Sequence, residues 1–337
     1  MRALAIGDRF IPASVLSGGL SALAELGYEA TIREWFHPDL AAIQEDNLAI
    51  EQRGPDAVVP PPELVADIAD YELLIVQFFP VGGALLEKAK KLRHIGILRA
   101  GIENVDRAAA TARGVEIIPT PGRNARAVAE FTVGMIIAET RNIARAHAAL
   151  KSGDFRKSFP NSDRIPELYG RRIGLVGLGN IGSLVAKYLA PFDCELLVYD
   201  PFLPSLPPGL TPCGDLDSLL SAADVVCMHM RLTDQTRHMI GPAQLAKMKP
   251  TAYLINTARA GLVDEKALVK ALRDKTIMGA ALDVFENEPP AGDDPLLGLD
   301  NLTLTTHLAG STIDSFVNTP RLFCEIFAKT VFSDFRR

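Results

Sequence analysis

The sequence predicts an α/β fold built from two domains with parallel sheets. Short apolar segments typical of buried strands alternate with helical patterns along the whole chain, and no internal repeat is visible. A length of 337 residues is about that of two domains. Hydrophobic residues make up 48% and charged residues 23% of the sequence, which is typical of a soluble globular protein with an apolar core.

The first domain is predicted from five strand-like segments with helical patterns between them, for example at 84–92. The strand candidates are residues 3–7, 29–32, 73–78, 95–98 and 115–120. Residues 121–153 have helical spacing, which predicts one long helix or a closely spaced pair that crosses from one domain to the other. The last thirty residues, 308–337, are also helical in pattern. We therefore expect the first domain to comprise residues 1–122 plus 310–337.

The second domain contains six strand-like segments separated by short helical patterns. They are residues 173–177, 194–200, 224–230, 252–257, 278–284 and 302–306. Six parallel strands is the count of a complete dinucleotide-binding domain of the Rossmann type. The sequence predicts such a domain over residues 123–309, together with a first domain of Rossmann-like or flavodoxin-like arrangement.

Charge and composition argue against several classes of partner. The formal net charge is −6 and there is no long basic run, which disfavours nucleic acid or an anionic membrane. No stretch offers the ~18 uninterrupted apolar residues of a membrane span, and the chain start looks like a strand rather than a signal peptide. The four cysteines form no metal-like cluster, so we expect no metal site and buried free thiols in a reducing cytoplasm.

A glycine-rich segment in the second domain matches the pattern G-x-G-x-x-G, at Gly177, Gly179 and Gly182. A strand precedes it, an amphipathic helix follows it, and the next strand ends in Asp200. In a dinucleotide-binding domain such glycines allow a tight turn and approach to a pyrophosphate, and the acid accepts hydrogen bonds from ribose hydroxyls. An aspartate also repels a 2′-phosphate, which favours NAD over NADP as cofactor. The alternative is a plain glycine turn, with Asp200 capping the turn before Pro201.

Three polar residues lie at or after the ends of the last three predicted strands, namely Arg259, Glu288 and His307. Ligands of open parallel sheets bind beyond the carboxyl ends of the strands, so these side chains can converge on one crevice. Arginine holds a carboxylate or polarises a carbonyl, histidine transfers a proton near neutral pH, and a neighbouring carboxylate favours the imidazolium. Beside a nicotinamide, this set suits the interconversion of a 2-hydroxy acid and a 2-oxo acid.

Each of these residues has an alternative interpretation. Arg259 is compatible with an ion pair across a loop, Glu288 with a solvated loop and His307 with a cap of the next turn. His229 also ends a predicted strand and competes for the proton-transfer role. It comes from an earlier strand and has no obvious acidic partner in its loop, so we rank it second.

With these motifs the sequence resembles the NAD-dependent D-2-hydroxyacid dehydrogenases, such as phosphoglycerate and glycerate dehydrogenases. The resemblance extends from about residue 94 to 312, whereas the first ninety residues match only in the rhythm of strands and helices. It rests on LRAGIENVD, PGRNARAVAE, GLVGLGNIG, VYDP, INTARAGLVDEKAL, ALDVFENEPP and THLAGST, in the family's usual order. The departures from common family residues are Glu103, Met230, Arg231 and Ala260, and none removes a catalytic group.

The resemblance implies roles for the matching positions. Arg259, Glu288 and His307 would be the catalytic residues, with Arg259 binding substrate and His307 giving and taking the proton. NAD would be bound by Gly177, Gly179, Asn180, Ile181, Gly182, Asp200, Met230, Thr257, Ala258 and Asp283. The first domain would bind the substrate carboxylate through Arg99, Ala100 and Gly101. Family members are usually homodimers, which is implied here as well.

These features predict a cytoplasmic NAD-dependent oxidoreductase that interconverts a D-2-hydroxy acid and a 2-oxo acid. One alternative is a non-catalytic NAD-binding scaffold similar to corepressors of this fold. Another is a formate-type dehydrogenase, in which the histidine generally lacks its carboxylate partner. The loop at 76–86 has no basic residue before Lys88, which disfavours a phosphorylated substrate, although Arg123 can supply charge. We expect a small unphosphorylated acid, such as a glycerate or a four- or five-carbon sugar acid.

Overall fold

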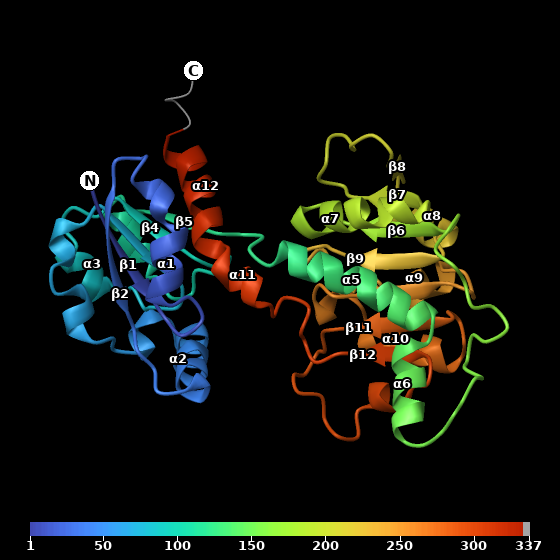
Figure 1. Cartoon of the computed structure of the whole chain (residues 1–337). Helices are drawn as coiled ribbons and strands as arrows, with labels where there is room; N and C mark the ends of the chain where they lie inside the picture. The colour runs from blue at the N-terminus through green and yellow to red at the C-terminus, as the bar shows by residue number, and fades with distance from the viewer. Residues whose placement is uncertain (333–337) are drawn as a thin grey trace. The chain divides into compact units, whose positions relative to one another are not determined.

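The computed structural model describes residues 1–332 and divides the chain into two compact units (Figure 1). Unit 1 is Met1–Arg123 together with the segment that begins at Thr312, and unit 2 is Asn124–Ser311. Each unit is built on one parallel sheet with helices, which confirms the predicted fold class. No helix within the described residues is long and apolar enough to cross a membrane.

Unit 1 has a five-stranded parallel sheet in the order β2-β1-β3-β4-β5. Its strands are β1 (Arg2–Gly7), β2 (Glu29–Glu34), β3 (Leu73–Val76), β4 (His94–Ile97) and β5 (Glu116–Pro119). Its helices are α1 (Ala13–Gly19), α2 (Leu40–Arg53), α3 (Gly83–Lys88), α4 (Arg107–Ala112), α11 (Ile313–Val317) and α12 (Thr319–Val331), with the short turns η1 (Ser21–Leu23), η2 (Pro55–Ala57), η3 (Pro62–Val65) and η4 (Ile68–Asp70). Leu4 and Ile6 of β1 join the core on one face, and Ala3 and Ala5 join the core on the other. Burial on both faces explains why the strands are almost continuously apolar.

The helices near the end of the described chain belong to unit 1. Figure 1 shows α12 beside α1, and the side chains of Phe323 and Phe327 are fully buried. A side chain on Gly96 of β4 would begin 2.3 Å from the ring of Phe323, so the approach of α12 to the sheet requires glycine there. Of the predicted helical end at 308–337, residues 333–337 lie outside the described residues.

Unit 2 has a seven-stranded parallel sheet in the order β12-β11-β10-β9-β6-β7-β8. Its strands are β6 (Arg172–Val176), β7 (Glu195–Tyr199), β8 (Thr211–Pro212), β9 (Val225–Met228), β10 (Tyr253–Asn256), β11 (Gly279–Leu282) and β12 (Leu302–Leu304). Counted from β6, the run β8-β7-β6-β9-β10-β11 has the order 3-2-1-4-5-6 of a dinucleotide-binding domain, which β12 extends by one strand. The sequence does not predict β8, because this short edge strand lies in a proline-rich segment without a strand pattern.

The helices of unit 2 cover both faces of its sheet. They are α5 (Ala125–Thr140), α6 (Ile143–Lys151), α7 (Asn180–Leu189), α8 (Leu216–Ala222), α9 (Pro242–Lys247) and α10 (Glu265–Arg273), with the turns η5 (Ala190–Phe192), η6 (Ala260–Leu262) and η7 (Pro295–Gly298). Helices α5 and α7 pack on one face and α8, α9 and α10 on the other. The segment at 121–153 contains a pair of helices, because Asn142, with a φ of 57°, turns the chain between α5 and α6.

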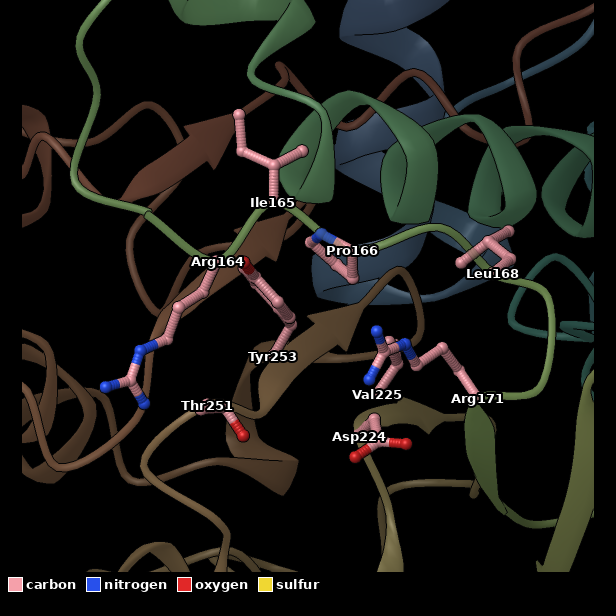
Figure 2. Close-up of a pocket in the computed structure, with 9 residues that line it drawn as sticks. All are labelled: Arg164, Ile165, Pro166, Leu168, Arg171, Asp224, Val225, Thr251 and Tyr253. Atoms are coloured by element: carbon pink, nitrogen blue, oxygen red, sulfur yellow. The ribbon is translucent and has the colours of Figure 1, made fainter. Parts of the chain in front are cut away.

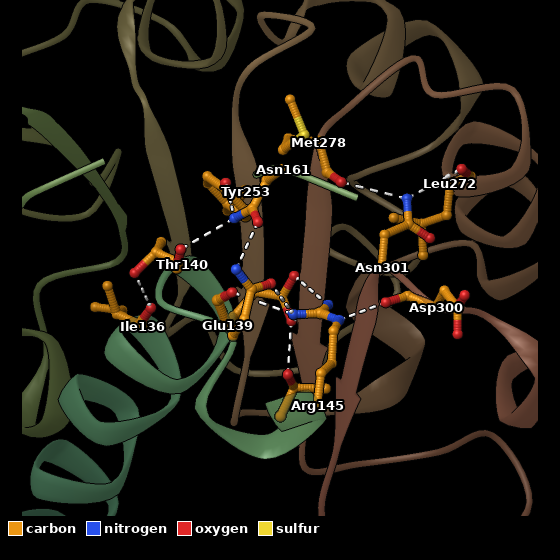
Figure 3. Close-up of polar contacts among 12 residues, drawn as sticks. Ile136, Glu139, Thr140, Arg145, Asn161, Tyr253, Leu272, Met278, Asp300 and Asn301 are labelled. Atoms are coloured by element: carbon orange, nitrogen blue, oxygen red, sulfur yellow. Dashed lines mark hydrogen bonds and ion pairs between the residues drawn. The ribbon is translucent and has the colours of Figure 1, made fainter. Parts of the chain in front are cut away.

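A buried ion pair fixes the junction of α5 and α6 (Figure 3). Both carboxylate oxygens of Glu139 lie 2.7 Å from Nη2 of Arg145, and the hydroxyl of Thr303 donates to Oε2 at 2.6 Å. Nε of Arg145 donates to the carbonyl oxygen of Asp300. Burial raises the pKa of Glu139, and the charge of Arg145 and the bond from Thr303 oppose this shift. Gly279 of β11 leaves room for the carboxylate, because a side chain there would begin 2.2 Å from Oε1 of Glu139.

We expect Arg145→Met to destabilise unit 2 by about 3–5 kcal/mol, because it leaves the carboxylate of Glu139 buried without its charged partner. Urea denaturation followed by circular dichroism measures this loss of unfolding free energy. Arg172→Met is the matched control, since Arg172 and Glu195 form an exposed pair that should contribute less than about 1 kcal/mol. Equal effects of the two substitutions would contradict the role assigned to the buried pair.

Candidate active site

The predicted glycine turn connects β6 to α7, and its glycines meet different requirements. Gly177 has a φ of 98°, and a side chain on it would begin 2.9 Å from Sδ of Met230. A side chain on Gly182 would begin 2.2 Å from the carbonyl oxygen of Gly177, so the packing of α7 excludes one. At Gly179 a side chain would meet no heavy atom of the described residues within 4 Å. Packing within unit 2 therefore does not require a glycine at Gly179, whereas a ligand that approaches the backbone does.

Helix α7 begins at this turn without a side-chain cap. Its N-cap residue is Gly179, so the N–H groups of the first turn, including those of Asn180 and Ile181, have no side-chain acceptor. Such a helix start binds a pyrophosphate through these N–H groups and the helix dipole. Asp200 follows β7 and accepts the backbone N–H of Leu178 at 2.8 Å. This carboxylate therefore also ties the glycine turn to the end of β7.

A pocket of about 530 Å³ extends from Asp200 along the segment that follows β7. Apolar residues dominate its lining, among them Val198, Leu206, Leu210 and Pro212. An apolar pocket that ends at a carboxylate fits an adenosine, whose base packs on apolar side chains and whose ribose hydroxyls donate to the carboxylate. The residues of unit 2 thus fit a dinucleotide whose pyrophosphate would lie at α7 and whose adenosine would lie in this pocket.

His307 and Glu288 form a hydrogen-bonded pair in the segments that follow β12 and β11. Nδ1 of His307 lies 2.7 Å from Oε2 of Glu288, and Oε1 of Glu288 accepts the backbone N–H of Phe285 at 3.0 Å. Burial alone would raise the pKa of Glu288, but the bonds from His307 and Phe285 and the charges of His307 and Arg259 lower it overall. The structure thus brings the three predicted catalytic residues together, and Nε2 of His307 has no acceptor among the described residues.

Buried Asp283 holds the segment that presents His307. Its Oδ1 accepts the hydroxyl of Thr305 at 2.6 Å and the N–H of Leu308 at 2.9 Å, and its Oδ2 accepts the N–H of Ala309 at 2.8 Å. His307 has a φ of 56°, a left-handed conformation that costs a residue other than glycine about 1–3 kcal/mol. The bonds to Asp283 hold the backbone in this conformation. The contact of Asp283 with a nicotinamide stays a prediction, since both of its oxygens already have partners. The same holds for Asp200 and a ribose, because its oxygens accept the N–H groups of Leu178 and Phe202.

Asn256, the last residue of β10, shapes the turn that exposes Arg259. Its side-chain amide donates to the carbonyl oxygen of Arg259 at 2.9 Å, and its side-chain oxygen accepts the N–H of Ala258 at 3.1 Å. The hydroxyls of Thr257 and Thr132 of α5 share a 2.7 Å hydrogen bond. Sequence motifs alone identify neither Asn256 as the partner of Arg259 nor Thr132 as the partner of Thr257. An asparagine that ends a strand before a turn is a weak signal for Asn256, and no sequence pattern connects Thr132 to Thr257.

His229, the other candidate for proton transfer, has different surroundings. Both of its ring nitrogens are buried, and neither has a hydrogen-bond partner among residues 1–332. Burial lowers its pKa to about 4, which keeps the imidazole neutral. The ring packs against the glycine turn at Gly182. These surroundings favour His307 over His229 as the proton donor.

The predicted substrate-binding residues of unit 1 follow β4. The guanidinium of Arg99 donates to the carbonyl oxygen of Gly101 and forms ion pairs with Glu51 and Glu103, so all three of its nitrogens have partners. The backbone N–H groups of Ala100 and Gly101 donate to no other group within the described part of the chain. The carboxylate of Glu103 lies against this loop, since a side chain on Gly101 would begin 2.9 Å from its Oε1, and it already pairs with Arg99. A substrate carboxylate that bound these N–H groups would therefore lie beside Glu103.

A second hollow of unit 2, shown in Figure 2, lies at the other ends of the strands. It has a volume of about 300 Å³, and its lining includes Asp224 and Val225 at the start of β9 and Tyr253 at the start of β10. There Nζ of Lys249 donates a hydrogen bond to Oδ1 of Asp224 at 2.8 Å. Because the glycine turn and the three predicted catalytic residues all follow the carboxyl ends of strands, we assign the candidate active site to those ends.

Comparison with known families identifies unit 2. Residues 133–309 match the model of the NAD-binding domain of the D-isomer specific 2-hydroxyacid dehydrogenases. The chain belongs to this family. The resemblance noted in the sequence is thereby confirmed, as is NAD as the cofactor of this D-2-hydroxyacid dehydrogenase domain.

Several proteins resemble this family member over most of its length. A D-3-phosphoglycerate dehydrogenase of Methanocaldococcus jannaschii is 42% identical over 255 residues, which cover 74% of this chain but only 48% of its own. A glyoxylate reductase of Thermofilum pendens is 42% identical over 263 residues, 75% of this chain and 76% of its own. The solved structure of a D-lactate dehydrogenase from Lactobacillus jensenii with NAD+ superposes with a TM-score of 0.72 at 27% identity, over 99% of this chain and 98% of that one. This chain therefore spans about half the length of the D-3-phosphoglycerate dehydrogenase.

We expect Gly179→Ala to weaken NADH binding about tenfold or more, while the free energy of unfolding changes by less than about 1 kcal/mol. The added methyl group meets no protein atom but occupies the approach of the backbone to a pyrophosphate. Fluorescence titration with NADH and urea denaturation measure the two effects. Gly182→Ala is the control, since its methyl group collides with Gly177 and should lower stability as well as affinity. An unchanged affinity of Gly179→Ala would place the pyrophosphate elsewhere.

Proposed function

We propose that this family member is an NAD-dependent oxidoreductase that interconverts a D-2-hydroxy acid and a 2-oxo acid. The observation that supports this best is the 2.7 Å pair of His307 and Glu288, with Arg259 close enough to help lower the pKa of Glu288. Together the three side chains offer a proton, a carboxylate that stabilises the imidazolium and a fixed positive charge. The names of the relatives, a glyoxylate reductase and a D-3-phosphoglycerate dehydrogenase among them, support the same class of reaction.

In the reductive direction, His307 donates a proton and Arg259 binds the acid. Because Nδ1 of His307 is bonded to Glu288, the proton passes from Nε2 to the carbonyl oxygen of the substrate. The guanidinium of Arg259 binds the substrate's oxygens and stabilises the negative charge that develops on the carbonyl oxygen. Bound NADH supplies the hydride that reduces the carbonyl carbon. In the oxidative direction, His307 accepts the proton as a general base.

We further propose that the remaining predicted residues bind the substrate carboxylate and the cofactor. The free N–H groups of Ala100 and Gly101 suit a carboxylate, whereas Arg99 joins them only if it leaves Glu51 or Glu103. In addition to the glycine turn and Asp200, the proposed cofactor contacts come from Met230, Thr257, Ala258 and Asp283.

We expect His307→Ala to lower kcat for the reduction of glyoxylate or hydroxypyruvate by about 10²–10⁴-fold, because general acid catalysis contributes about that much. Arg259→Ala should lower kcat/KM by about 10²–10³-fold, through loss of the charge at the developing oxyanion. Glu288→Gln removes the carboxylate that orients the imidazole of His307 and stabilises its charged form, so reductive turnover should fall below that of the wild type. The absorbance of NADH follows all three reactions.

His238→Ala is the matched control for these variants, since His238 forms a similar exposed pair with Glu286 at 3.4 Å. Equal activity of the wild type, Arg259→Ala and His307→Ala on every acid would refute the assignment of the catalytic residues. A wild type that binds NADH but reduces no 2-oxo acid would support the non-catalytic scaffold instead.

We also propose that the protein forms a homodimer through unit 2. Helix α6 and the segment that follows it expose large apolar side chains, and those of Phe155 and Tyr169 are 74% and 73% exposed. The other members of this set are Ile143, Leu150 and Ile165. Ile143 and Leu150 lie seven residues apart on α6 and therefore share one face of this helix, and exposed apolar faces mark interaction surfaces. A dimer is also what the family resemblance implies.

Leu150→Glu should shift the protein from dimer towards monomer, because it places a charge in an apolar contact. Sedimentation velocity over a range of protein concentrations measures the shift. Leu48→Glu on α2 of unit 1 is the control, since Leu48 is 54% exposed and Leu150 is 59% exposed. A wild type that sediments as a monomer at all concentrations would contradict the dimer.

A further inference from the structure

Four polar residues follow four different strands of unit 1, and we call them the strand-end cluster: Asp8, Gln77, Arg99 and Arg123. Asp8 follows β1 and Gln77 follows β3, and these strands are neighbours in the order β2-β1-β3-β4-β5. The strand order reverses between β1 and β3, so the two residues flank the topological switch point of the sheet. Ligands of open α/β sheets bind at such a point, beyond the carboxyl ends of the strands.

Three members of the cluster have buried polar atoms without a hydrogen-bond partner among the described residues. These atoms are Oδ2 of Asp8, both amide atoms of Gln77 and Nη1 of Arg123. The residues Asp8 and Gln77 are each only 1% exposed. Nearly all buried polar atoms of native proteins are hydrogen-bonded, so several such atoms at one switch point indicate a site that a polar ligand completes. The carboxylate of Asp8 accepts hydrogen bonds, the guanidinium of Arg123 donates them and the amide of Gln77 does both. Such a set matches hydroxyl groups, which also donate and accept.

Aromatic rings connect the two arginines of the cluster. The guanidinium of Arg99 lies 4.8 Å from the ring centroid of Phe78, and that of Arg123 lies 4.6 Å from the ring centroid of Phe316. Phe10 joins the two, since its ring centroid is 5.9 Å from that of Phe78 and 5.2 Å from that of Phe316. Aromatic surfaces with a few placed polar groups are typical of small-molecule sites.

Asp8 contributes a carboxyl group with one oxygen in reserve. Its Oδ1 accepts the backbone N–H groups of Phe10 and Ile11 at 2.9 and 3.0 Å, which leaves Oδ2 for another donor. Burial raises the pKa of Asp8 to about 6, and the bonds from Ile11 and Phe10, the charge of His37 and the backbone N–H of Phe78 oppose the shift. Asp8 also lies close enough to Arg123 for their charges to interact. At neutral pH this carboxyl group is therefore mainly ionised and accepts hydrogen bonds.

The charges around the cluster are unfavourable for a phosphate. Arg99 is already paired with Glu51 and Glu103, and Arg123 has Asp8 nearby. Two guanidinium groups thus face three carboxylates. A phosphate dianion would add two further negative charges to the carboxylate that every 2-oxo acid carries, whereas neutral hydroxyl groups would add none.

We propose that the strand-end cluster binds the hydroxylated, unphosphorylated carbon chain of a 2-oxo acid substrate, as found in a sugar acid. This inference rests on the proposed function and adds the substrate class to it. Asp8, Gln77 and Arg123 are then specificity-determining residues. Substrate hydroxyls donate to Asp8, accept from Arg123 and do both with Gln77, while the rings of Phe10 and Phe78 pack against carbon.

Steady-state kinetics with three acids tests this proposal: glyoxylate, a 2-oxo sugar acid of four or five carbons, and 3-phosphohydroxypyruvate. In the wild type we expect kcat/KM for the sugar acid to exceed the other two values about tenfold or more. Gln77→Leu keeps the side-chain size but removes the hydrogen bonds, so it should raise KM for the sugar acid and reduce the preference about tenfold. Asp8→Asn, which keeps an acceptor for Phe10 and Ile11, should act in the same direction. Gln44→Leu on the exposed side of α2 is the control and should keep the preference.

A gain of activity tests the charge argument. Glu103→Gln removes one carboxylate partner of Arg99 and lowers the negative excess. It should raise kcat/KM for 3-phosphohydroxypyruvate about fivefold relative to the wild type. The exposed Glu63→Gln, on a different segment of unit 1, serves as the charge control. Equal values for Glu103→Gln and the control would overturn the claim that these carboxylates exclude phosphate.

Two outcomes overturn the inference and leave the proposed function intact. In one, the wild type reduces glyoxylate without any preference for the sugar acid, or prefers the phosphorylated acid. In the other, Gln77→Leu raises the melting temperature and keeps the preference, which makes Gln77 a core residue. If no acid is reduced, the proposed function fails, and calorimetric titration with the 2-oxo sugar acid decides the inference. Binding by the wild type that Gln77→Leu loses then supports it, and no binding by the wild type overturns it.

Discussion

The register of the parallel sheet in unit 2 is the constraint on which the candidate active site depends. The last residues of β9, β10 and β11 pair in register, so these strands end at the same edge. The next residues, His229, Thr257 and Asp283, are therefore aligned by backbone hydrogen bonds before any side chain acts. A slip of one residue would turn each of these side chains to the other face of the sheet. Correct pairing of apolar strands thus also aligns the polar residues that follow them.

Buried polar groups then hold the segments that present the chemistry. The carboxylate of Asp283 would be costly to bury alone, but three donors from the segment around His307 satisfy it. Each of these bonds restricts that segment, so the burial of one carboxylate fixes the position of an exposed imidazole. Asn256 does the same for the turn of Arg259. Asp283 and Asn256 are buried, whereas the side chains that they position, those of His307 and Arg259, stay exposed to a ligand.

The contrast between exposed reacting side chains and the buried residues that position them explains which site residues the sequence predicts and which it does not. Arg259, Glu288 and His307 can be selected from the sequence because parallel strands end together whatever packs around them. Partners that depend on tertiary packing leave no such pattern. Glu139 and Arg145 look like ordinary charged helix residues, although they form a buried pair. The two-residue strand β8 is too short to give a periodic signal.

The two units apply the same strand-end rule with different polar chemistry. In unit 2 His307 and Glu288 satisfy each other, which fixes a proton where the proposed reaction needs it. In unit 1 Asp8 and Gln77 keep atoms without protein partners, which is hydrogen-bonding capacity for recognition. On the proposed function, contacts to an unreacting carbon chain are equal in the ground state and the transition state. They therefore select which acid binds, whereas the pair in unit 2 determines how fast a bound acid reacts.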